Sequence, residues 1–439
     1  MIRKLSNLPL LLSICIGLSS ALSVIAAGPL AIQNAKIIPI ASETIERGSI
    51  LIEDGQIVAF GADIDIPGEA KVIDAEGKVI MPGFIDAHNS AAMSQANEQN
   101  SVVPFLSVVD SIDPIATYFE ECRRNGITTA AVVPGNSTLI GGKAVVVKTA
   151  GQYVNDMIVE RDFALKLSLR PTSGSRMSQM ARLRKELDKA QKALEDKEEE
   201  DSDKEKTEEA KKESADGEKK EESEEKKPEP AQPSAADEGL EALKLVVQGK
   251  MPVYIYCQEA MDVPAAKKLI EDYNLKAIFV LGQSCYKAAD LFAEANQPVI
   301  LDPTLVFWEN NPRTREDKKV ALPEVYKDKK VPFIFQISDS ASRRTLGSSY
   351  FWYQAATAVK YGISEDDALK ALTLDPAKLI GIDDLVGSIE VGKNADLVVL
   401  TGNPLEIGTW VEKTIVDGEI VYDRATDEKL ERLLAPKAE

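Results

Sequence analysis

Histidine is nearly absent from this sequence: His88 is the only one among 439 residues. Any imidazole chemistry is therefore confined to one position, and a site built from several histidines is excluded. His88 lies in the segment 79–90, which reads VIMPGFIDAHNS. Pro82 and Gly83 indicate a turn that leads into a short buried strand, and the strand delivers polar side chains at its carboxyl end.

Cysteine is scarce as well. Of the four cysteines, Cys122, Cys257 and Cys285 lie outside the first 27 residues. Three cysteines in a chain of this length exclude a disulfide scaffold. We interpret them as small buried apolar side chains, with a Cys257–Cys285 disulfide as the alternative.

Positive charge is in deficit, since the net charge is -19 and the isoelectric point is about 4.8. This argues against a nucleic-acid partner and against attraction to anionic lipid. Residues 195–230 contain 18 acidic residues against 9 lysines. The Glu/Lys-rich insert 195–236 has almost no apolar residue, so we expect a disordered segment or a solvated helical extension of a helix over 177–194. It is interpreted as having no partner, and a docking tail for a basic partner is the alternative.

The first 27 residues have the layout of a secretory signal peptide. Arg3 and Lys4 precede an apolar run that ends in small residues. We expect cleavage after Ala26 or Ala27, export to a periplasmic or extracellular location, and no stable membrane anchor. An uncleaved membrane anchor is the alternative, because the run is about 20 residues long.

Short strands and turns dominate both ends of the remaining chain. Asp54-Gly55 between two apolar runs is typical of a hairpin, and the segment 414–422 repeats this pattern. Each end is too small to fold alone, so we predict one composite β-sandwich from residues 28–80 plus 385–425.

Between the ends, strand-like and helix-like segments alternate, which predicts parallel βα units. The fold class is therefore α/β, with a TIM-like (β/α)8 barrel over 81–384. Seven strands are expected, and the eighth should lie near 144–148 or 156–160. The other predicted strands are 128–133, 163–169, 253–258, 277–281, 299–302 and 333–338, and the predicted helices include 265–273, 286–295 and 365–372.

The segment PGFIDAH at 82–88 resembles the first barrel strand of the amidohydrolase superfamily, and its imidazolonepropionase-like branch most closely. Similar family segments are found at 125–129, 141–149, 176–180, 361–378 and 386–397. The resemblance implies a hydrolase of carbon–nitrogen bonds whose metal is held by histidines after three strands and by an aspartate.

At the positions that the resemblance assigns to metal ligands, only His88 and Asp339 remain. The second histidine of the first strand is replaced by Ser90, and the later ones by Tyr256, Gln258 and either Gly282 or Gln283. We therefore predict a degraded metal site and no retained zinc. A weakly held divalent cation with oxygen donors from Asn89, Gln258, Gln283 and Ser284 is the alternative.

Three functions remain open for this site. In the first, Asp339 acts as general base and His88 polarises a carbonyl, while Tyr256, Gln258, Gln283 and Asn89 contact a small substrate with an amide or carbonyl group. The second is a binding protein without turnover. The third is a structural subunit, in a homo-oligomer or with an intact amidohydrolase. His88 could also be a purely structural histidine, and Asp339 a strand-end cap or a partner of Arg343 or Arg344.

Overall fold

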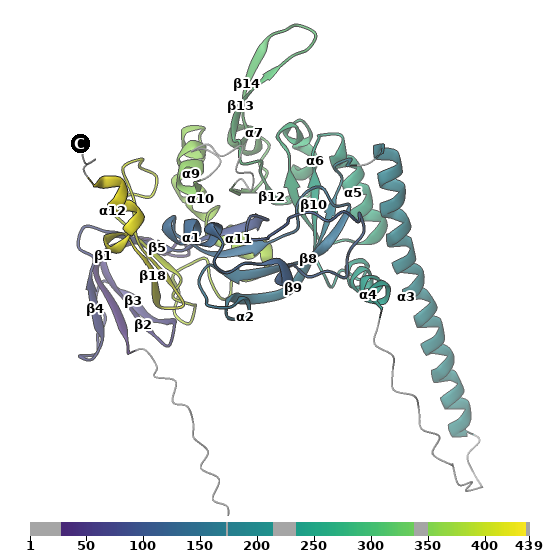
Figure 1. The fold of residues 1–439 in the computed structure, drawn as a ribbon, viewed down its shortest axis with the longest axis horizontal. Helices are drawn as coiled ribbons and strands as arrows, with labels where there is room; N and C mark the ends of the chain where they lie inside the picture. The colour runs from purple at the N-terminus through teal and green to yellow at the C-terminus, as the bar shows by residue number, and fades with distance from the viewer. Residues whose placement is uncertain (1–27, 173, 214–233, 338–349, 436–439) are drawn as a thin grey trace, which may run out of the picture.

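The computed structural model describes residues 28–172, 174–213, 234–337 and 350–435. The signal-peptide prediction, Asp339, Arg343 and Arg344 lie outside these residues. Within them, no helix is long and apolar enough to cross a membrane. Two eight-stranded sheets and a two-stranded hairpin make up the β-structure, and helices pack around the larger body (Figure 1).

One sheet is assembled from both ends of the chain, in the order β18-β17-β16-β5-β1-β2-β3, with β4 paired to β1. Asp54 and Gly55 both have positive φ, which is the geometry of a type I′ turn, so the hairpin expected there is present. The domain boundaries themselves stay a prediction. The strands of this sheet are β1 Leu30–Ile37, β2 Ile45–Glu53, β3 Gln56–Gly61, β4 Lys71–Asp74, β5 Val79–Pro82, β16 Leu397–Leu400, β17 Val411–Val416 and β18 Glu419–Asp423.

The second sheet has the order β15-β12-β11-β10-β9-β8-β7-β6. Its strands are β6 Phe84–Asn89, β7 Ile127–Val132, β8 Ile140–Lys148, β9 Ile158–Ser168, β10 Val253–Cys257, β11 Ala277–Leu281, β12 Val299–Ile300 and β15 Phe333–Ile334. Seven of these strands run parallel, whereas β8 is antiparallel to both of its neighbours.

The (β/α)8 expectation needs correction at two points. The extra strand near 144–148 is β8, but it belongs to a β7–β8–β9 meander and not to a parallel βα unit. In addition, among the described residues β15 and β6 form the two ends of the sheet and no backbone pairing closes it into a barrel. The strand predicted over 333–338 is correspondingly short, Phe333–Ile334.

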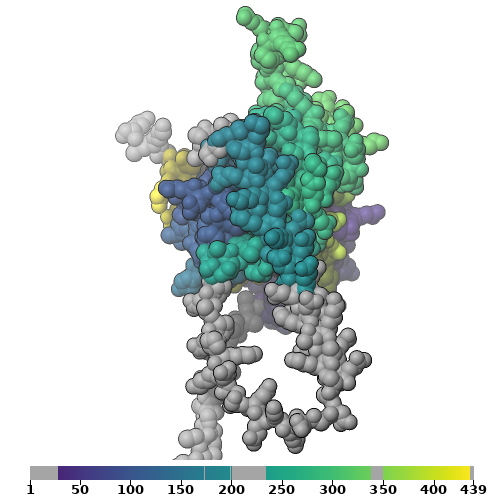
Figure 2. Space-filling model, turned by 90° about the vertical axis from the view of Figure 1, so that its right-hand side faces the viewer, coloured from purple at the N-terminus to yellow at the C-terminus, as the bar shows by residue number. Residues whose placement is uncertain are grey.

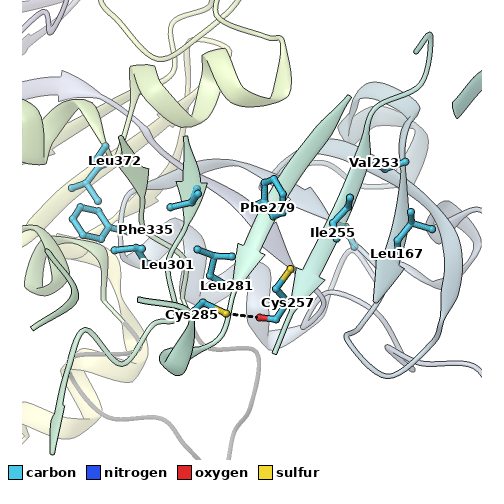
Figure 3. Packing of buried hydrophobic residues seen from close by; sticks show 14 of the residues in the cluster. Leu167, Val253, Ile255, Cys257, Phe279, Leu281, Cys285, Leu301, Phe335 and Leu372 are labelled. Carbon is cyan, nitrogen blue, oxygen red and sulfur yellow. Dashed lines mark hydrogen bonds between the residues drawn. The ribbon is translucent and has the colours of Figure 1, made fainter. Parts of the chain in front are cut away.

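Most of the helices that pack on this sheet cover one of its faces. Because side chains alternate along a strand, Leu167, Ile255 and Phe279 point to the helical side, where they join the largest apolar cluster (Figure 3). The helices are α1 Thr117–Arg124, α2 Val154–Met157, α3 Arg176–Glu213, α4 Ala235–Val247, α5 Asp262–Tyr273, α6 Asp290–Ala293, α7 Leu322–Asp328, α9 Phe351–Lys360, α10 Glu365–Lys370, α11 Leu374–Ile380 and α12 Glu428–Leu434. The 3₁₀ helices are η1 Val108–Ser111, η2 Gln283–Ala288 and η4 Arg424–Thr426.

The opposite face of the sheet has its own apolar cluster. It contains small and branched side chains such as Ala87, Ala131, Val146 and Val280, and α11 packs against it. This is the face toward which the inward residues of β9 and β10 point, so it determines which side chains reach the candidate site.

Two local predictions can be compared with the structure. The helix predicted over 286–295 is divided into η2 and α6. The cysteines Cys122, Cys257 and Cys285 are buried free thiols, as the first interpretation proposed. The Cys285 thiol donates a hydrogen bond to the carbonyl oxygen of Cys257 over 3.2 Å, which is the dashed line in Figure 3.

The long helix α3 runs to Glu213, so residues 195–213 are helical, as in the helical-extension alternative for the insert; residues 214–233 lie outside the described part of the chain. Leu183, Leu187 and Ala190 attach the first half of α3 to the core. The hairpin β13 Val306–Asn310 with β14 Asp317–Ala321 was not predicted, and it projects from the body (Figure 2).

Candidate functional site

His88 owes its position to an irregularity in β6. Asp86 pairs with Ala130 and Asn89 with Val132, so Ala87 and His88 lie together opposite the single residue Ala131. Such an extra residue reverses the alternation of side chains, and residues beyond it turn to the other face. His88 can therefore approach the inward side chains of β9 and β10. The ring centres of His88 and Tyr254 are 5.7 Å apart.

Both ring nitrogens of His88 are held by neighbouring side chains. Its Nδ1 lies 2.9 Å from Gln336 Oε1, and its Nε2 lies 2.8 Å from Lys166 Nζ. The Gln336 amide nitrogen donates to the carbonyl oxygen of Leu301, which directs its oxygen toward the imidazole. His88 therefore donates from Nδ1 to Gln336 and accepts at Nε2 from the lysine ammonium. The pair also links the segment after β15 to β6, the two ends of the open sheet.

The imidazole is held in its neutral form. Burial is the largest cause that lowers the pKa of His88 well below 6.5, and the positive charge of Lys166 lowers this pKa further; the hydrogen bond to Gln336 opposes the shift. A neutral imidazole whose accepting nitrogen already receives a hydrogen bond has no site left for a substrate proton. In this arrangement His88 orients Lys166 and is not a general base.

Lys166 is a candidate site residue that the sequence analysis did not single out. Its side chain is fully buried, although lysine is almost never buried without partners. The Nζ atom lies 5.7 Å from the ring centre of Tyr256 and 6.0 Å from that of Tyr254. The sequence does carry an indication: a lysine interrupts the apolar pattern ALKLS of a strand buried on both faces. Gln336 was missed for a different reason, since an amide at a strand end is common.

Asp86 forms a second buried polar group next to His88. The Tyr118 hydroxyl donates to Asp86 Oδ2 over 3.1 Å, and the backbone N–H of His88 donates to Oδ1 over 3.4 Å. Burial and then the charge of Asp86 raise the pKa values of both Tyr118 and Tyr254 well above 10, so both phenols stay protonated. The Tyr254 hydroxyl donates to the carbonyl oxygen of Ala87 over 2.8 Å, which ties β10 to the irregular turn of β6.

The other predicted site residues are placed differently relative to the buried group of His88 and Lys166, which is called the Lys166 centre below. Tyr256 is half-buried beside Lys166. Asn89 is buried, but its amide serves the backbone of Ala91 and Ile337. Gln258 lines an open groove farther along the strand ends, and Gln283 is exposed at the start of η2. The structure therefore brings together His88 and Tyr256, and it places Gln258 and Gln283 outside the centre.

The described residues do not fit a metal ion of the kind that the family resemblance implies. His88 offers no free nitrogen, and the adjacent ammonium of Lys166 repels a cation. Among the residues that the structure describes, no group of three or more histidine, cysteine, aspartate or glutamate side chains is arranged to hold one.

An α/β sheet with polar side chains gathered at the carboxyl ends of its parallel strands is a ligand-binding architecture. The comparisons with known proteins agree with this class. The Amidohydrolase family model matches residues 309–421. A crystal structure of an amidohydrolase from Thermotoga maritima is similar with a TM-score of 0.73 at 27% identity, and the match covers 90% of this chain and 100% of that one.

Two sequence relatives extend the comparison. Amidohydrolase tasK of Hapsidospora irregularis is 23% identical over 425 residues, which is 86% of this chain and 39% of tasK. An imidazolonepropionase of Geobacillus thermodenitrificans is 41% identical over 63 residues, or 13% of this chain and 15% of that protein. The chain thus spans well under half the length of these relatives that it matches. The chain is thus similar to amidohydrolases: the family model matches its carboxyl-terminal part, and the tasK and Thermotoga maritima matches extend over most of its length.

Proposed function

We propose that this protein hydrolyses a carbon–nitrogen bond in a small amide or carbonyl compound, and that Lys166 supplies the positive charge at its site. The proposal rests mainly on one contact: the Lys166 ammonium lies 2.8 Å from His88 Nε2, near the carboxyl ends of the strands. A fixed cation in a site that excludes water stabilises an oxyanion as it forms on a carbonyl oxygen. His88 and Gln336 hold that cation in place.

Access to Lys166 requires movement. The side chain has no exposed surface, and the ring of Tyr256 lies next to Nζ. In this proposal Tyr256 turns aside to admit the substrate carbonyl and then covers it. Asp339, which the resemblance places at a metal-ligand position and the first functional hypothesis makes the general base, lies outside the described residues, and its role stays a sequence prediction. Export likewise stays a prediction.

The test is hydrolysis by protein that has been purified and treated with a chelator. N-acyl amino acids, dipeptides and cyclic amides are screened, and Lys166→Met and Lys166→Arg are compared with the parent chain on any compound that is turned over. We expect turnover without zinc and a loss on the order of 100-fold in Lys166→Met, the usual effect of removing one oxyanion donor. Lys268→Met, an exposed lysine of α5, is the matched control.

Elemental analysis of the untreated protein completes this test. Stoichiometric zinc that is needed for turnover and disappears in His88→Ala would contradict the proposal. Folding of each variant is checked by thermal unfolding, because Lys166 and His88 are buried.

Recognition without turnover is the second candidate. It is favoured by the engagement of both His88 nitrogens, which leaves the imidazole unable to take up a proton in this arrangement. Binding of an amide compound that Lys166→Met weakens, with no product above that of heat-inactivated protein, would support it in place of hydrolysis.

A further inference from the structure

A groove of about 620 Å³ lies at the carboxyl ends of β9, β10 and β11, beyond the Lys166 centre. Arg170 follows β9, the segment Gln258–Met261 follows β10, and Ser284 and Lys287 belong to η2 after β11. Because these strands are parallel, their carboxyl ends meet at one edge of the sheet. The groove therefore lies on the same edge as His88 and Lys166.

The pairing of β9 with β10 relates Arg170 and Gln258 to each other and to Lys166, which lies on the same strand as Arg170. Tyr254 pairs with Lys166, and Tyr256 pairs with Ser168. The Leu169 N–H continues this ladder by donating to the carbonyl oxygen of Tyr256 over 2.9 Å. Arg170 and Gln258 are the next residues of the same alternation on the two chains, and both line the groove. The rise of a parallel strand is about 3.3 Å per residue, so four residues separate Lys166 from Arg170 by roughly 13 Å along the backbone. Both side chains are long, which allows their charged ends to come closer.

Three of the charged side chains that line the groove have a partner within the described residues. Arg176 Nε contacts Asp262 Oδ1 at 2.8 Å, and Lys287 Nζ contacts Glu309 Oε1 at 2.5 Å. Glu259, the acidic side chain that lines the groove, accepts a hydrogen bond from the Ser284 hydroxyl over 2.5 Å.

Arg170 differs from these cations. Its guanidinium is exposed and makes no ion pair within the described part of the chain, and the half-buried Gln258 amide has no side-chain hydrogen bond there. A guanidinium fork beside an amide N–H₂ group has the donor geometry that carboxylates bind.

We infer that Arg170 and Gln258 bind the carboxylate of the ligand, so that the substrate of this site is an amide that also carries a carboxylate, such as an N-acyl amino acid or a short peptide with a free carboxyl end. The inference rests on the proposed function for the identity of the bond that is hydrolysed. The binding of the carboxylate does not depend on it. Arg170 and Gln258 anchor one end of the ligand, and its carbonyl extends along β9 and β10 toward Tyr256 and Lys166.

The test compares N-acetyl-L-leucine with N-acetyl-L-leucinamide, which differ only in the carboxylate. Equilibrium binding to the full chain is measured by calorimetry. We expect the acid to bind about 10-fold to 100-fold more tightly than the amide, the range for hydrogen bonds to a charged group. Arg170→Gln should abolish this preference, and Gln258→Leu should reduce it.

Arg161→Gln is the matched control, because Arg161 is an exposed arginine near the opposite end of the same strand, β9. It should leave the preference unchanged. Equal binding of the two probes, binding of neither, or an equal effect of Arg161→Gln and Arg170→Gln would overturn the inference.

Lys166→Met separates this inference from the proposed function. If that variant keeps the preference for the acid and no variant or parent chain forms product, the groove stands and hydrolysis fails. If the parent chain hydrolyses both probes equally well, hydrolysis stands and the groove fails.

Discussion

At the residue scale, His88 is held between Lys166 and Gln336, and its hydrogen bonds assign it a neutral form with the proton on Nδ1. A histidine that binds a metal needs a ring nitrogen whose lone pair is not already used in a hydrogen bond. His88 does not meet this requirement, because its Nε2 accepts a hydrogen bond from Lys166. Because the chain contains one histidine, this assignment can be examined without any need to separate overlapping resonances.

The first prediction concerns the titration of His88. Its imidazole NMR signals should not change between about pH 8 and pH 6, because burial and the Lys166 charge lower its pKa below the usual 6.5. In Lys166→Met the charge is gone but the burial remains, so the pKa should rise while it stays below 6.5. Lys268→Met should have no effect. Ordinary titration near pH 6.5 in the parent chain would contradict the arrangement.

The second prediction concerns stability at mildly acidic pH. Below about pH 6.5 the unfolded chain takes up a proton at this histidine and the folded chain does not, so the free energy of unfolding should decrease as the pH falls from about 6.5 toward the lowered pKa of the folded state. The slope contributed by one proton is at most about 1.4 kcal/mol per pH unit.

The measurement is urea unfolding of the parent chain and of His88→Gln at pH 7.5 and pH 5.5. The glutamine amide can replace the hydrogen bonds of the ring but does not titrate. The difference in stability between the two chains should therefore shift in favour of the variant at the lower pH. An unchanged difference would mean that His88 has the same pKa in both states.

Sequence reasoning selected His88 as a candidate site residue, because a lone histidine after a buried strand is distinctive, and the structure places it in a buried polar cluster. It did not identify the neighbours that determine what His88 does. Lys166 and Gln336 are 78 and 248 residues away along the chain, and their contacts depend on the irregular turn in β6. The apolar pattern of a strand predicts that it is buried, but it does not predict such a one-residue irregularity.

At the element scale, α12 is fixed to α1 by Asp427. This carboxylate accepts hydrogen bonds from Arg124 Nε and Nη2 at 2.8 and 3.1 Å and from the backbone N–H groups of Lys429 and Leu430, so it is also the N-cap of α12. The hydrogen bonds from Arg124 are the largest cause that lowers the pKa of Asp427 well below its usual range.

The third prediction is that Asp427→Ala destabilises the folded chain by about 2 kcal/mol, through loss of both the cap and the contact with Arg124. For Asp427, the stabilisation is fully present above its unfolded pKa of about 3.9 and is lost as the pH falls toward the lowered pKa of the folded state. The loss in Asp427→Ala should thus be present at pH 7 and smaller near pH 3.

Urea unfolding at both pH values checks this. Glu428→Gln is the control, because Glu428 is the next acidic residue and its ion pair with Arg432 is exposed on both sides. An equal loss in the control would assign the effect to net charge and not to the contact with Arg124.

Most strands of the larger sheet could be predicted because they are continuous apolar runs bounded by turns, as in 253–258 and 277–281. The apolar pattern does not predict whether a strand runs parallel or antiparallel to its neighbours. β8 has the same composition as a parallel strand, yet it pairs antiparallel with β7 and β9. The hairpin β13–β14 was missed because most of its residues are exposed or half-buried and its strands show no alternation of apolar side chains.

At the scale of the whole molecule, residues that are distant in sequence share one sheet: β5 pairs with both β1 and β16. The buried Lys148 of β8 connects the two large sheets, since its Nζ lies 2.8 Å from Asp396 and 3.1 Å from Asp417. The amidohydrolase resemblance indicated both sheets, because its matching segments extend from 82 to 397. It did not indicate this buried ion pair, which depends on how the two sheets are packed.

The last prediction concerns the acidic insert, which begins within the second half of α3. Leu183, Leu187 and Ala190 are fully buried, and the Tyr273 hydroxyl donates to Asp188 over 2.6 Å, so α3 is fixed to the body along 183–190. On the other side of the insert, Ser234 caps α4. The Glu/Lys composition of 200–233 offers few apolar side chains to bury.

Replacing residues 200–233 with a short Gly/Ser bridge should therefore change the unfolding free energy by only about 1 kcal/mol and the melting temperature by a few degrees. Leu187→Ala should instead cost about 3 kcal/mol, because it leaves a cavity in the core. Thermal and urea unfolding of the two variants distinguish the attached part of α3 from the rest, and a loss of soluble protein in the deletion as large as in Leu187→Ala would show that the insert packs on the body.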